Sequence, residues 1–308
     1  MPPVQSKARV VAIACADIHL QHNAPACRAG EPNWYKAMAR PLDEMRALAE
    51  KYEVPILCAG DVFDKWNSGP ELINWAIKHL PKMYAVPGQH DLPQHRLDDV
   101  RKSAYWTLVE AGVIKNLPVG MPLYIDESTA VHGFPWGVEI EAKELNRQGI
   151  NIAVAHQYRW IKGHCYTGAQ TSARVSMAQG LTDFDVVIFG DNHSGFLTKV
   201  GTKTTVFNCG TLMRRKSDEA YYQPQVGIIY SDGCVVPHLL DTSEDQLDST
   251  KKEAPETETV RMDVREFLGQ LTNLNKTSLD YQFAIERYIE DHEVGEATKQ
   301  ILAQVLGE

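Results

Sequence analysis

The chain has 308 residues, of which 44% are hydrophobic and 23% are charged, and its formal net charge is -9. These values are ordinary for a soluble globular protein and allow one large or two modest domains. No apolar run approaches the roughly 20 residues that span a bilayer, residues 1–7 lack the apolar core of a secretory signal, and the six cysteines form no Cys-x-x-Cys pair. A cytoplasmic protein without a membrane segment, a disulfide framework or a thiolate zinc site is therefore expected.

The N-terminal part of the chain alternates between strand-like and helix-like segments. Apolar, β-rich runs predict buried strands, and apolar residues at helical spacing predict the helices between them. The expected strands are 9–16, 54–57 and 82–86, and the expected helices are 34–52, 70–80 and 97–111. This order predicts an α/β sheet covered by helices.

Strands dominate the chain between residues 122 and 239. The expected strands are 122–125, 129–134, 152–155, 186–189, 204–208, 226–230 and 234–239, and residues 231–233 predict a hairpin turn. Short strands of this kind are typical of a second sheet that packs on the first. The predicted fold class is α/β, an α+β sandwich of two mixed β-sheets flanked by helices.

The C-terminal part of the chain is acidic. Residues 241–308 carry 16 acidic and 7 basic side chains, so they account for the whole net charge, and residues 1–240 are balanced. The polar, acidic residues 241–258 predict a linker. Residues 259–308 show helical periodicity and predict a small helical tail that could dock a partner or cap the main domain, which is expected at residues 1–240.

Five polar clusters each follow an expected strand and occupy a loop. The carboxyl ends of strands are where open α/β sheets bind ligands. Phosphoester hydrolysis by two divalent ions about 3.5–4 Å apart needs a carboxylate that bridges them, with imidazole and oxygen ligands on each side. Asp61 is expected to be that bridge, with one carboxylate oxygen on each ion. The clusters are Asp17-Ile18-His19, Gly60-Asp61-Val62-Phe63-Asp64, Gly88-Gln89-His90-Asp91, His156 and Gly190-Asp191-Asn192-His193.

This ordered set of motifs resembles the calcineurin-like metallophosphoesterase superfamily over roughly residues 9–240. Within that superfamily the chain is most similar to the SbcD-type DNA-repair nucleases of phage and bacteria. The closer similarity depends on residues 17–20, on residues 88–93 and on Asn208-Cys209-Gly210-Thr211-Leu212-Met213-Arg214-Arg215. The resemblance implies a four-layer metallophosphoesterase fold.

The resemblance also implies roles for single residues. One metal ion would be held by Asp17, His19, Asp61 and His193, and a second by Asp61, Gln89, His156 and Asp191. His90 would be the general acid or a phosphate contact, and Asp91 would orient its imidazole. Gln89 stands where the family commonly has Asn, and Asp191 where it commonly has His. Both supply oxygen ligands, which favour Mn²⁺, or Mg²⁺, over Zn²⁺.

Other polar residues near these motifs allow two interpretations. Arg214 and Arg215 belong to a basic run that either faces solvent or contacts a nucleic-acid backbone. His164 is a candidate phosphate contact, and Asp64 is expected either to cap its loop or to support a ligand. Three aromatic residues after residue 156 suit either stacking on unpaired bases or a packed loop core, namely Tyr158, Trp160 and Tyr166.

The sequence therefore predicts a dinuclear metal-dependent phosphodiesterase, a DNA exonuclease or endonuclease in which a metal-bridging hydroxide attacks phosphorus while His90 assists the leaving group. Two alternatives stay open. One is a phosphomonoesterase or cyclic-nucleotide phosphodiesterase with the same site, and the other is a non-catalytic scaffold with a decayed second metal site. The resemblance further implies DNA as substrate and an SMC-like ATPase partner, and it leaves formation of a homodimer open.

Overall fold

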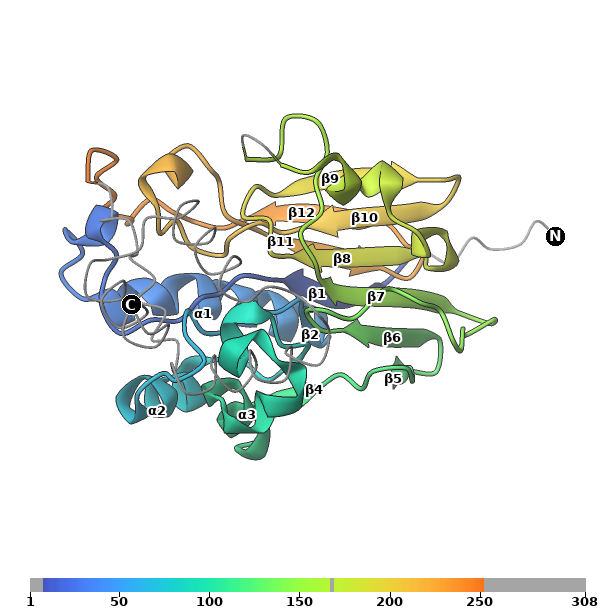
Figure 1. Ribbon diagram of the computed structural model, residues 1–308, viewed down its shortest axis with the longest axis horizontal. Helices are drawn as coiled ribbons and strands as arrows, with labels where there is room; N and C mark the ends of the chain where they lie inside the picture. Colours follow the sequence, from blue (N-terminus) through green and yellow to red (C-terminus); the bar gives the residue numbers. More distant parts are fainter. Residues whose placement is uncertain (1–7, 167–168, 252–308) are drawn as a thin grey trace, which may run out of the picture. The chain divides into compact units, whose positions relative to one another are not determined.

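Two six-stranded β-sheets face each other in this computed structural model, which describes residues 8–166 and 169–251. The strand order is β12-β11-β1-β2-β3-β4 in the first sheet and β5-β6-β7-β8-β10-β9 in the second (Figure 1). Both sheets are mixed. The pairs β1–β11, β11–β12, β5–β6 and β9–β10 are antiparallel, and the other neighbouring strands are parallel. The predicted fold class of two mixed sheets flanked by helices is confirmed.

Most elements lie where the sequence patterns predict them. The first sheet contains β1 (Val10–Cys15), β2 (Ile56–Cys58), β3 (Met83–Ala85), β4 (Ile114–Asn116), β11 (Gln225–Tyr230) and β12 (Val235–Leu239). The second contains β5 (Leu123–Asp126), β6 (Thr129–Phe134), β7 (Ile150–His156), β8 (Val186–Gly190), β9 (Phe196–Val200) and β10 (Thr204–Asn208). The α-helices of the described residues are α1 (Trp34–Tyr52), α2 (Pro70–His79) and α3 (Ala104–Glu110).

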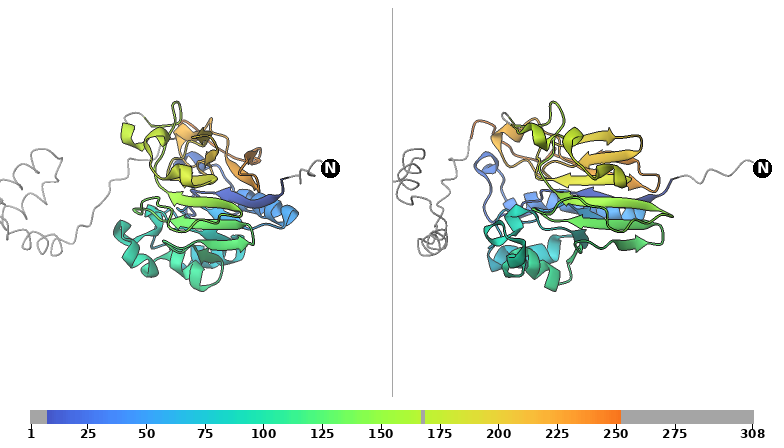
Figure 2. Two further views of the ribbon diagram at one scale, coloured as in Figure 1. Left: turned by 90° about the vertical axis from the view of Figure 1, so that its right-hand side faces the viewer. Right: turned by 45° about the vertical axis from the view of Figure 1, so that its right-hand side comes forward.

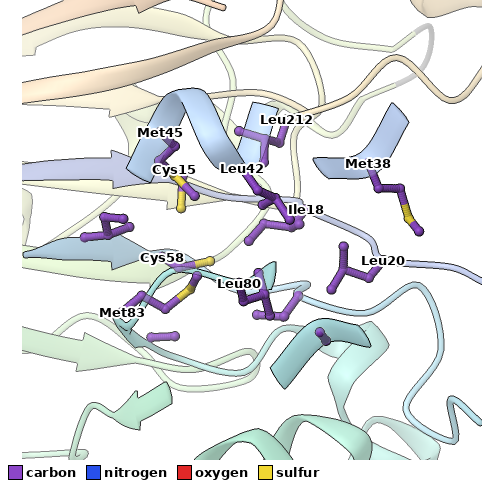
Figure 3. Packing of buried hydrophobic residues seen from close by; sticks show 14 of the residues in the cluster. Cys15, Ile18, Leu20, Met38, Leu42, Met45, Cys58, Leu80, Met83 and Leu212 are labelled. Carbon is purple, nitrogen blue, oxygen red and sulfur yellow. The ribbon is translucent and has the colours of Figure 1, made fainter. Parts of the chain in front are cut away.

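Three buried apolar clusters hold the layers together, and the ribbon of these layers is drawn from two further sides in Figure 2. The cluster between the two sheets includes Leu57 of β2 and Phe207 of β10. A second cluster joins the first sheet to α1, α2 and α3, and Figure 3 shows Leu42 of α1 and Cys15 of β1 among its members. The third cluster covers the outer face of the second sheet with short 3₁₀ helices, to which Leu181 belongs. Burial of these apolar faces is the main favourable contribution to folding.

Some segments differ from the expected elements. The helix expected at 97–111 is interrupted, because Ser103 begins α3 by accepting a hydrogen bond from Trp106 N at 3.2 Å, whereas residues 97–102 form a 3₁₀ helix. Ser is favoured at this capping position. The strands β4 and β9 have no counterpart among the predicted strands. Both are short edge strands that alternate with exposed residues, so their apolar pattern is weak.

Residues 241–251, the described part of the acidic linker predicted at 241–258, contact the main domain. The Asp245 carboxylate accepts hydrogen bonds from Arg28, Arg40 and Arg214 at 2.8–3.2 Å. Asp248 N donates to Cys27 O at 2.7 Å. Asp245 thereby joins this acidic segment to three arginines of the main domain. The predicted helical tail at 259–308 lies outside the described residues.

The sandwich brings together the loops that carry the polar clusters. These loops follow β1, β2, β3 and β8, and His156 is the last residue of β7. In the second sheet His156 pairs in register with Gly190, and a Cβ atom on Gly190 would overlap Ala59 O of the first sheet. The strand ends of both sheets therefore meet at one site. In the part of the chain that the structure describes, no helix has the length and apolar character needed to cross a membrane.

Candidate metal centre

The backbone turns sharply where the strands lead into the site. Asp17, His19, Asp61 and Asp191 have φ values of 51°, 48°, 54° and 76°. Residues other than Gly rarely adopt this left-handed conformation, and such strain concentrates at functional sites. Asp17 N donates a hydrogen bond to Gly60 O at 3.0 Å, and His19 N donates to Asp61 O at 2.9 Å. The strained backbone therefore sets the direction of four predicted ligands.

The first half of the centre consists of Asp17, His19 and His193, whose ligand atoms lie within 4.8 Å of one another. Nε2 of His19 lies 3.1 Å from Nε2 of His193 and 4.0 Å from Oδ1 of Asp17. Nδ1 of His193 lies 3.0 Å from Oε1 of Glu219, so a proton on Nδ1 leaves the Nε2 lone pair facing His19. Burial, followed by the charge of Arg215 and those of nearby imidazoles, lowers the pKa of His19 well below its usual value. A neutral imidazole is the form that binds metals.

Asp61 joins this first half to the second. Its Oδ1 accepts a hydrogen bond from His90 N at 3.0 Å. Its Oδ2 is buried, has no hydrogen-bond partner among the described residues, and lies 3.6 Å from His19 Nε2 and 3.4 Å from His156 Nε2. The sequence predicts that each carboxylate oxygen of Asp61 binds one ion. The geometry differs, because Oδ1 already accepts the hydrogen bond from His90 N. Oδ2 is the atom that faces both halves.

The second half consists of Gln89, His156 and Asp191, which the structure brings together as predicted. Oε1 of Gln89 lies 2.6 Å from Nε2 of His156, and Nε2 of Gln89 donates to Oδ1 of Asp191 at 2.7 Å. Nδ1 of His156 lies 2.6 Å from Ala59 O. Among the described residues, Asp191 belongs to none of the three clusters of His, Asp, Glu or Cys that could hold an ion. In this half the predicted ligands bond mainly to one another.

The buried carboxylates of the centre require a positive charge. Burial raises the pKa of Asp17 to about 6, although His193 and His156 lower it. Burial would lower the pKa of His156, but Asp61, Asp17 and Asp191 raise it well above its usual value. Three carboxylates therefore lie close to one buried imidazole. With the unpartnered Oδ2 of Asp61, this set of imidazole and carboxylate groups fits divalent metal ions.

His90 lies at the open side of the centre. Its side chain is exposed, and its ring meets that of His19 edge-on with the centroids 4.9 Å apart. Its Nδ1 lies 2.8 Å from Asp64 O, so a proton on Nδ1 is donated to that carbonyl. The hydrogen-bond partner of the His90 imidazole is therefore a backbone carbonyl.

The prediction that Asp91 orients His90 is wrong. The Asp91 carboxylate is buried and accepts hydrogen bonds from the backbone N–H groups of Val62, Phe63 and Gly88 at 3.0–3.1 Å. Burial raises the pKa of Asp91 to about 7, and the charge of Asp61 adds to that rise. Asp91 therefore connects the loop after β2 to the loop after β3. Both of its carboxylate oxygens accept hydrogen bonds from backbone N–H groups and not from His90.

The family model for calcineurin-like phosphoesterases matches residues 11–195, which is more than half of the chain and includes every predicted metal ligand. The chain belongs to this family. It is accordingly a metal-dependent phosphoesterase, a hydrolase.

Several solved structures are similar to this phosphoesterase at low sequence identity. The calcineurin-like phosphoesterase YfkN from Bacillus subtilis is 15% identical, with 80% of this chain and 94% of that chain covered and a TM-score of 0.43. The phosphopantetheinyl hydrolase PptH from Mycobacterium tuberculosis is 13% identical, with 77% and 99% covered and a TM-score of 0.42. The protein TT1561 of Thermus thermophilus is 12% identical, with 76% and 100% covered and a TM-score of 0.44. No curated protein matches the chain.

Arg214 and Arg215, the two arginines of the basic run, pair with carboxylates of the phosphoesterase. Arg215 is buried, and its Nη1 donates to Oδ1 of Asp64 at 2.8 Å. Nη2 of Arg214 donates to Oδ2 of Asp245 at 3.0 Å. Arg215 therefore does not face solvent, and a contact of either arginine with a nucleic-acid backbone stays a prediction. Oδ1 of Asp64 also lies 3.7 Å from His19 Nδ1, and a role for Asp64 in supporting that ligand stays a prediction.

Asn192 fixes the loop that follows β7. Its Nδ2 donates to the carbonyls of Arg159 at 2.8 Å and His164 at 3.0 Å. The His164 ring packs edge-on against Phe196, with centroids 6.2 Å apart, and its role as a phosphate contact stays a prediction. Trp160 is buried and lies under the guanidinium of Arg174, at 4.7 Å. This aromatic residue belongs to the core of the loop.

Glu219 is the site residue that the sequence patterns missed. Besides its contact with His193, its Oε2 accepts hydrogen bonds from Arg215 N at 2.6 Å and Lys216 N at 3.0 Å. Burial would raise the pKa of Glu219, but the hydrogen bond and charge of His193 lower it, so the carboxylate stays anionic. Glu219 lies 26 residues after its partner and in no motif. Only the fold reveals it.

Proposed function

We propose that this phosphoesterase is a dinuclear metal-dependent phosphodiesterase that cleaves DNA. The observation that carries the metal chemistry is the buried Oδ2 of Asp61, which has no hydrogen-bond partner in the described chain and faces imidazoles of both halves. A buried anionic oxygen is costly unless a donor or a cation compensates it. Divalent cations held by Asp61 and these imidazoles would provide that compensation.

The two halves supply the proposed ligands. Asp17, His19 and His193 would hold the first ion together with Oδ2 of Asp61. The second ion would share Oδ2 and take the three side chains of the second half, Gln89, His156 and Asp191. The oxygen-rich second half favours Mn²⁺, with Mg²⁺ next, over Zn²⁺.

When bound, the two ions neutralise charge on the phosphoryl oxygens and provide a water nucleophile that is active near neutral pH. The protein orients the remaining groups. Because Asp64 O holds Nδ1 of His90, Nε2 is the atom of that exposed ring that can carry a proton to the leaving oxygen. Glu219 and Ala59 O fix the rings of His193 and His156 from behind.

The choice of DNA as substrate draws support from the resemblance of residues 17–20, 88–93 and 208–215 to the SbcD-type nucleases. The charge distribution also supports a DNA substrate. Residues 1–240 carry equal numbers of acidic and basic side chains, so two bound divalent ions would give this part of the chain a positive net charge. The same resemblance supports an SMC-like ATPase partner docked on residues 259–308, and that proposal concerns a segment outside the described residues. A homodimer is the remaining proposal for assembly.

A substrate panel tests the proposed function. Mn²⁺-loaded protein is assayed with bis(p-nitrophenyl) phosphate, p-nitrophenyl phosphate, a cyclic nucleotide and linear DNA, with the D61N variant as the control for contaminating enzymes. We expect metal-dependent cleavage of the bis-ester and of DNA. Cleavage of the mono-ester or cyclic nucleotide alone would assign one of the alternative esterase activities. Fewer than about one ion per chain, without hydrolysis of any substrate, would instead indicate a non-catalytic scaffold.

A further inference from the structure

A cavity of about 330 Å³ adjoins the second half of the metal centre. His156 and Asp191 form part of its lining, and Trp136, Tyr158 and Arg159 form another part. Pockets for organic ligands begin at roughly 300 Å³, so the cavity has room for one small organic group and not for a duplex. Metal ions at the centre do not need this additional volume. The space is therefore available to a part of the substrate beside the phosphate.

The lining side chains are held in place by the fold. Trp136 N donates to Pro87 O at 3.2 Å, in the segment that leads to Gln89, and the Trp136 ring meets that of His95 edge-on at 5.5 Å. The Tyr158 hydroxyl accepts a hydrogen bond from Tyr166 N at 3.3 Å. Side chains that are already ordered lose little entropy on binding, which favours affinity for a rigid ligand.

The chemistry of the lining matches a planar aromatic ligand that carries hydrogen-bond acceptors. Trp136 and Tyr158 offer aromatic rings, on which nucleobases stack regardless of sequence. Arg159 donates to Ser172 O and to Gln157 Oε1, but its buried Nε has no partner among the described residues. Buried donors of this kind are normally paired. The ring nitrogens and carbonyl oxygens of a base are suitable acceptors.

We propose that this cavity, the Trp136 pocket, binds the nucleobase of a nucleotide next to the scissile phosphate. The proposal rests on the proposed phosphodiesterase function and specifies its substrate. Because the pocket admits one base, that base must be unpaired, as it is in a single strand or at a frayed end. A nucleotide seated there would have its phosphate beside His156 and Asp191, which belong to both the pocket and the second half.

Abasic substrates test the pocket without any mutation. Single-stranded oligonucleotides carry one tetrahydrofuran abasic residue on either side of the cleaved bond, and kcat/KM of the wild-type protein is measured for each. We expect a loss of about tenfold or more for one of the two positions, the effect of removing one stacked base. Equal cleavage of base-bearing and abasic substrates would overturn the pocket and leave the phosphodiesterase function intact.

Variants then assign the effect to the pocket. Trp136→Ala should lower kcat/KM by about tenfold on the base-bearing substrate and leave the abasic substrate unaffected, whereas Trp136→Phe should keep most of the activity. Tyr124→Ala is the matched control, because Tyr124 is 56% exposed on the edge strand β5 and does not line the cavity. An equal loss by W136A on both substrates would show a structural role and overturn the proposal.

A binding measurement separates the pocket from catalysis. Calorimetry compares adenosine 5′-monophosphate with ribose 5-phosphate, which has the same phosphate and lacks the base. We expect at least about tenfold tighter binding of the nucleotide and loss of that difference in Trp136→Ala. If no phosphodiester is hydrolysed, the proposed function fails, and this comparison still decides the pocket. Equal affinities for the two probes would overturn it.

Discussion

The two halves of the metal centre contain similar side chains but differ in the hydrogen bonds that these side chains make with one another. In the first half a single contact of 3.1 Å joins the two facing imidazoles, and Glu219 holds His193 from behind. In the second half Gln89 spans His156 and Asp191 with two contacts of 2.6 and 2.7 Å. Each hydrogen bond that an ion must displace subtracts about 1 kcal/mol from its binding free energy. The two halves should therefore bind an ion with different strength, and we expect the first half to fill before the second.

The largest effect is expected from Asp61→Asn, which removes the anionic oxygen shared by both halves. Both ions should bind weakly, and kcat/KM on a bis-ester should fall by more than the roughly 10³-fold that loss of one transition-state contact causes. The metal content after Mn²⁺ loading measures the loss of ions, and steady-state kinetics measure the fall in kcat/KM. Asp17→Asn is the matched control and should retain the ion of the second half. Two retained ions in D61N would contradict the shared role.

His90→Ala tests the group that belongs to neither half. Metal content should stay at the wild-type level, and kcat should fall by about 10²-fold, the lower range for removal of a general acid. The loss should be greatest for substrates with poor leaving groups, because these depend most on protonation. A series of aryl phosphodiesters with different leaving groups measures this dependence. A uniform loss would assign His90 to phosphate binding.

Glu219→Gln tests the first half alone. The amide keeps the shape but removes the charge that orients and polarises His193, so Mn²⁺ affinity of the first half should fall by about 10–100-fold, as for other groups that support a metal-binding histidine. Calorimetric titration with Mn²⁺ would show this as a weakened first event and an unchanged second. Gln89→Asn provides the matching change in the second half and should affect only the second event. If both variants weakened the same Mn²⁺-binding event, the two halves would not be separate metal sites.

Asp245→Asn is expected to leave both halves unchanged and to affect stability. Burial would raise the pKa of Asp245, but the hydrogen bond from Arg40 and the charges of Arg28 and Arg214 lower it. Loss of the charge should reduce the free energy of unfolding by about 1–3 kcal/mol near neutral pH, with Mn²⁺ stoichiometry unchanged.

The pH dependence of that effect has a definite sign. Because the folded pKa of Asp245 is below the unfolded value, its stabilisation is complete above roughly pH 4 and is lost as the pH falls through the folded pKa. Urea unfolding of wild type and variant from about pH 6 down to pH 3 measures the difference, which should shrink toward the acid end. A constant difference would show that the charge is not the cause.

The apolar runs before Asp17, Asp61 and His156 were enough to predict that each of these residues ends a strand. The ligand roles of these residues came from the resemblance and stay predictions. The partners of these groups could not be predicted. Asp91 stands beside His90 in the sequence, yet it bonds to backbone N–H groups, and Glu219 reaches His193 from a distant loop. Partner choice depends on side-chain positions in space, for which the sequence carries no periodic signal.

The left-handed backbone at Asp17, His19, Asp61 and Asp191 has a consequence for ion exchange. The covalent chain already presents these ligands in their final directions, so an arriving ion has little chain to order. Chelation should consequently remove the ions without unfolding the sandwich, unlike in small zinc domains whose fold depends on the metal. Removal and return of the ions should therefore be reversible without refolding of the chain.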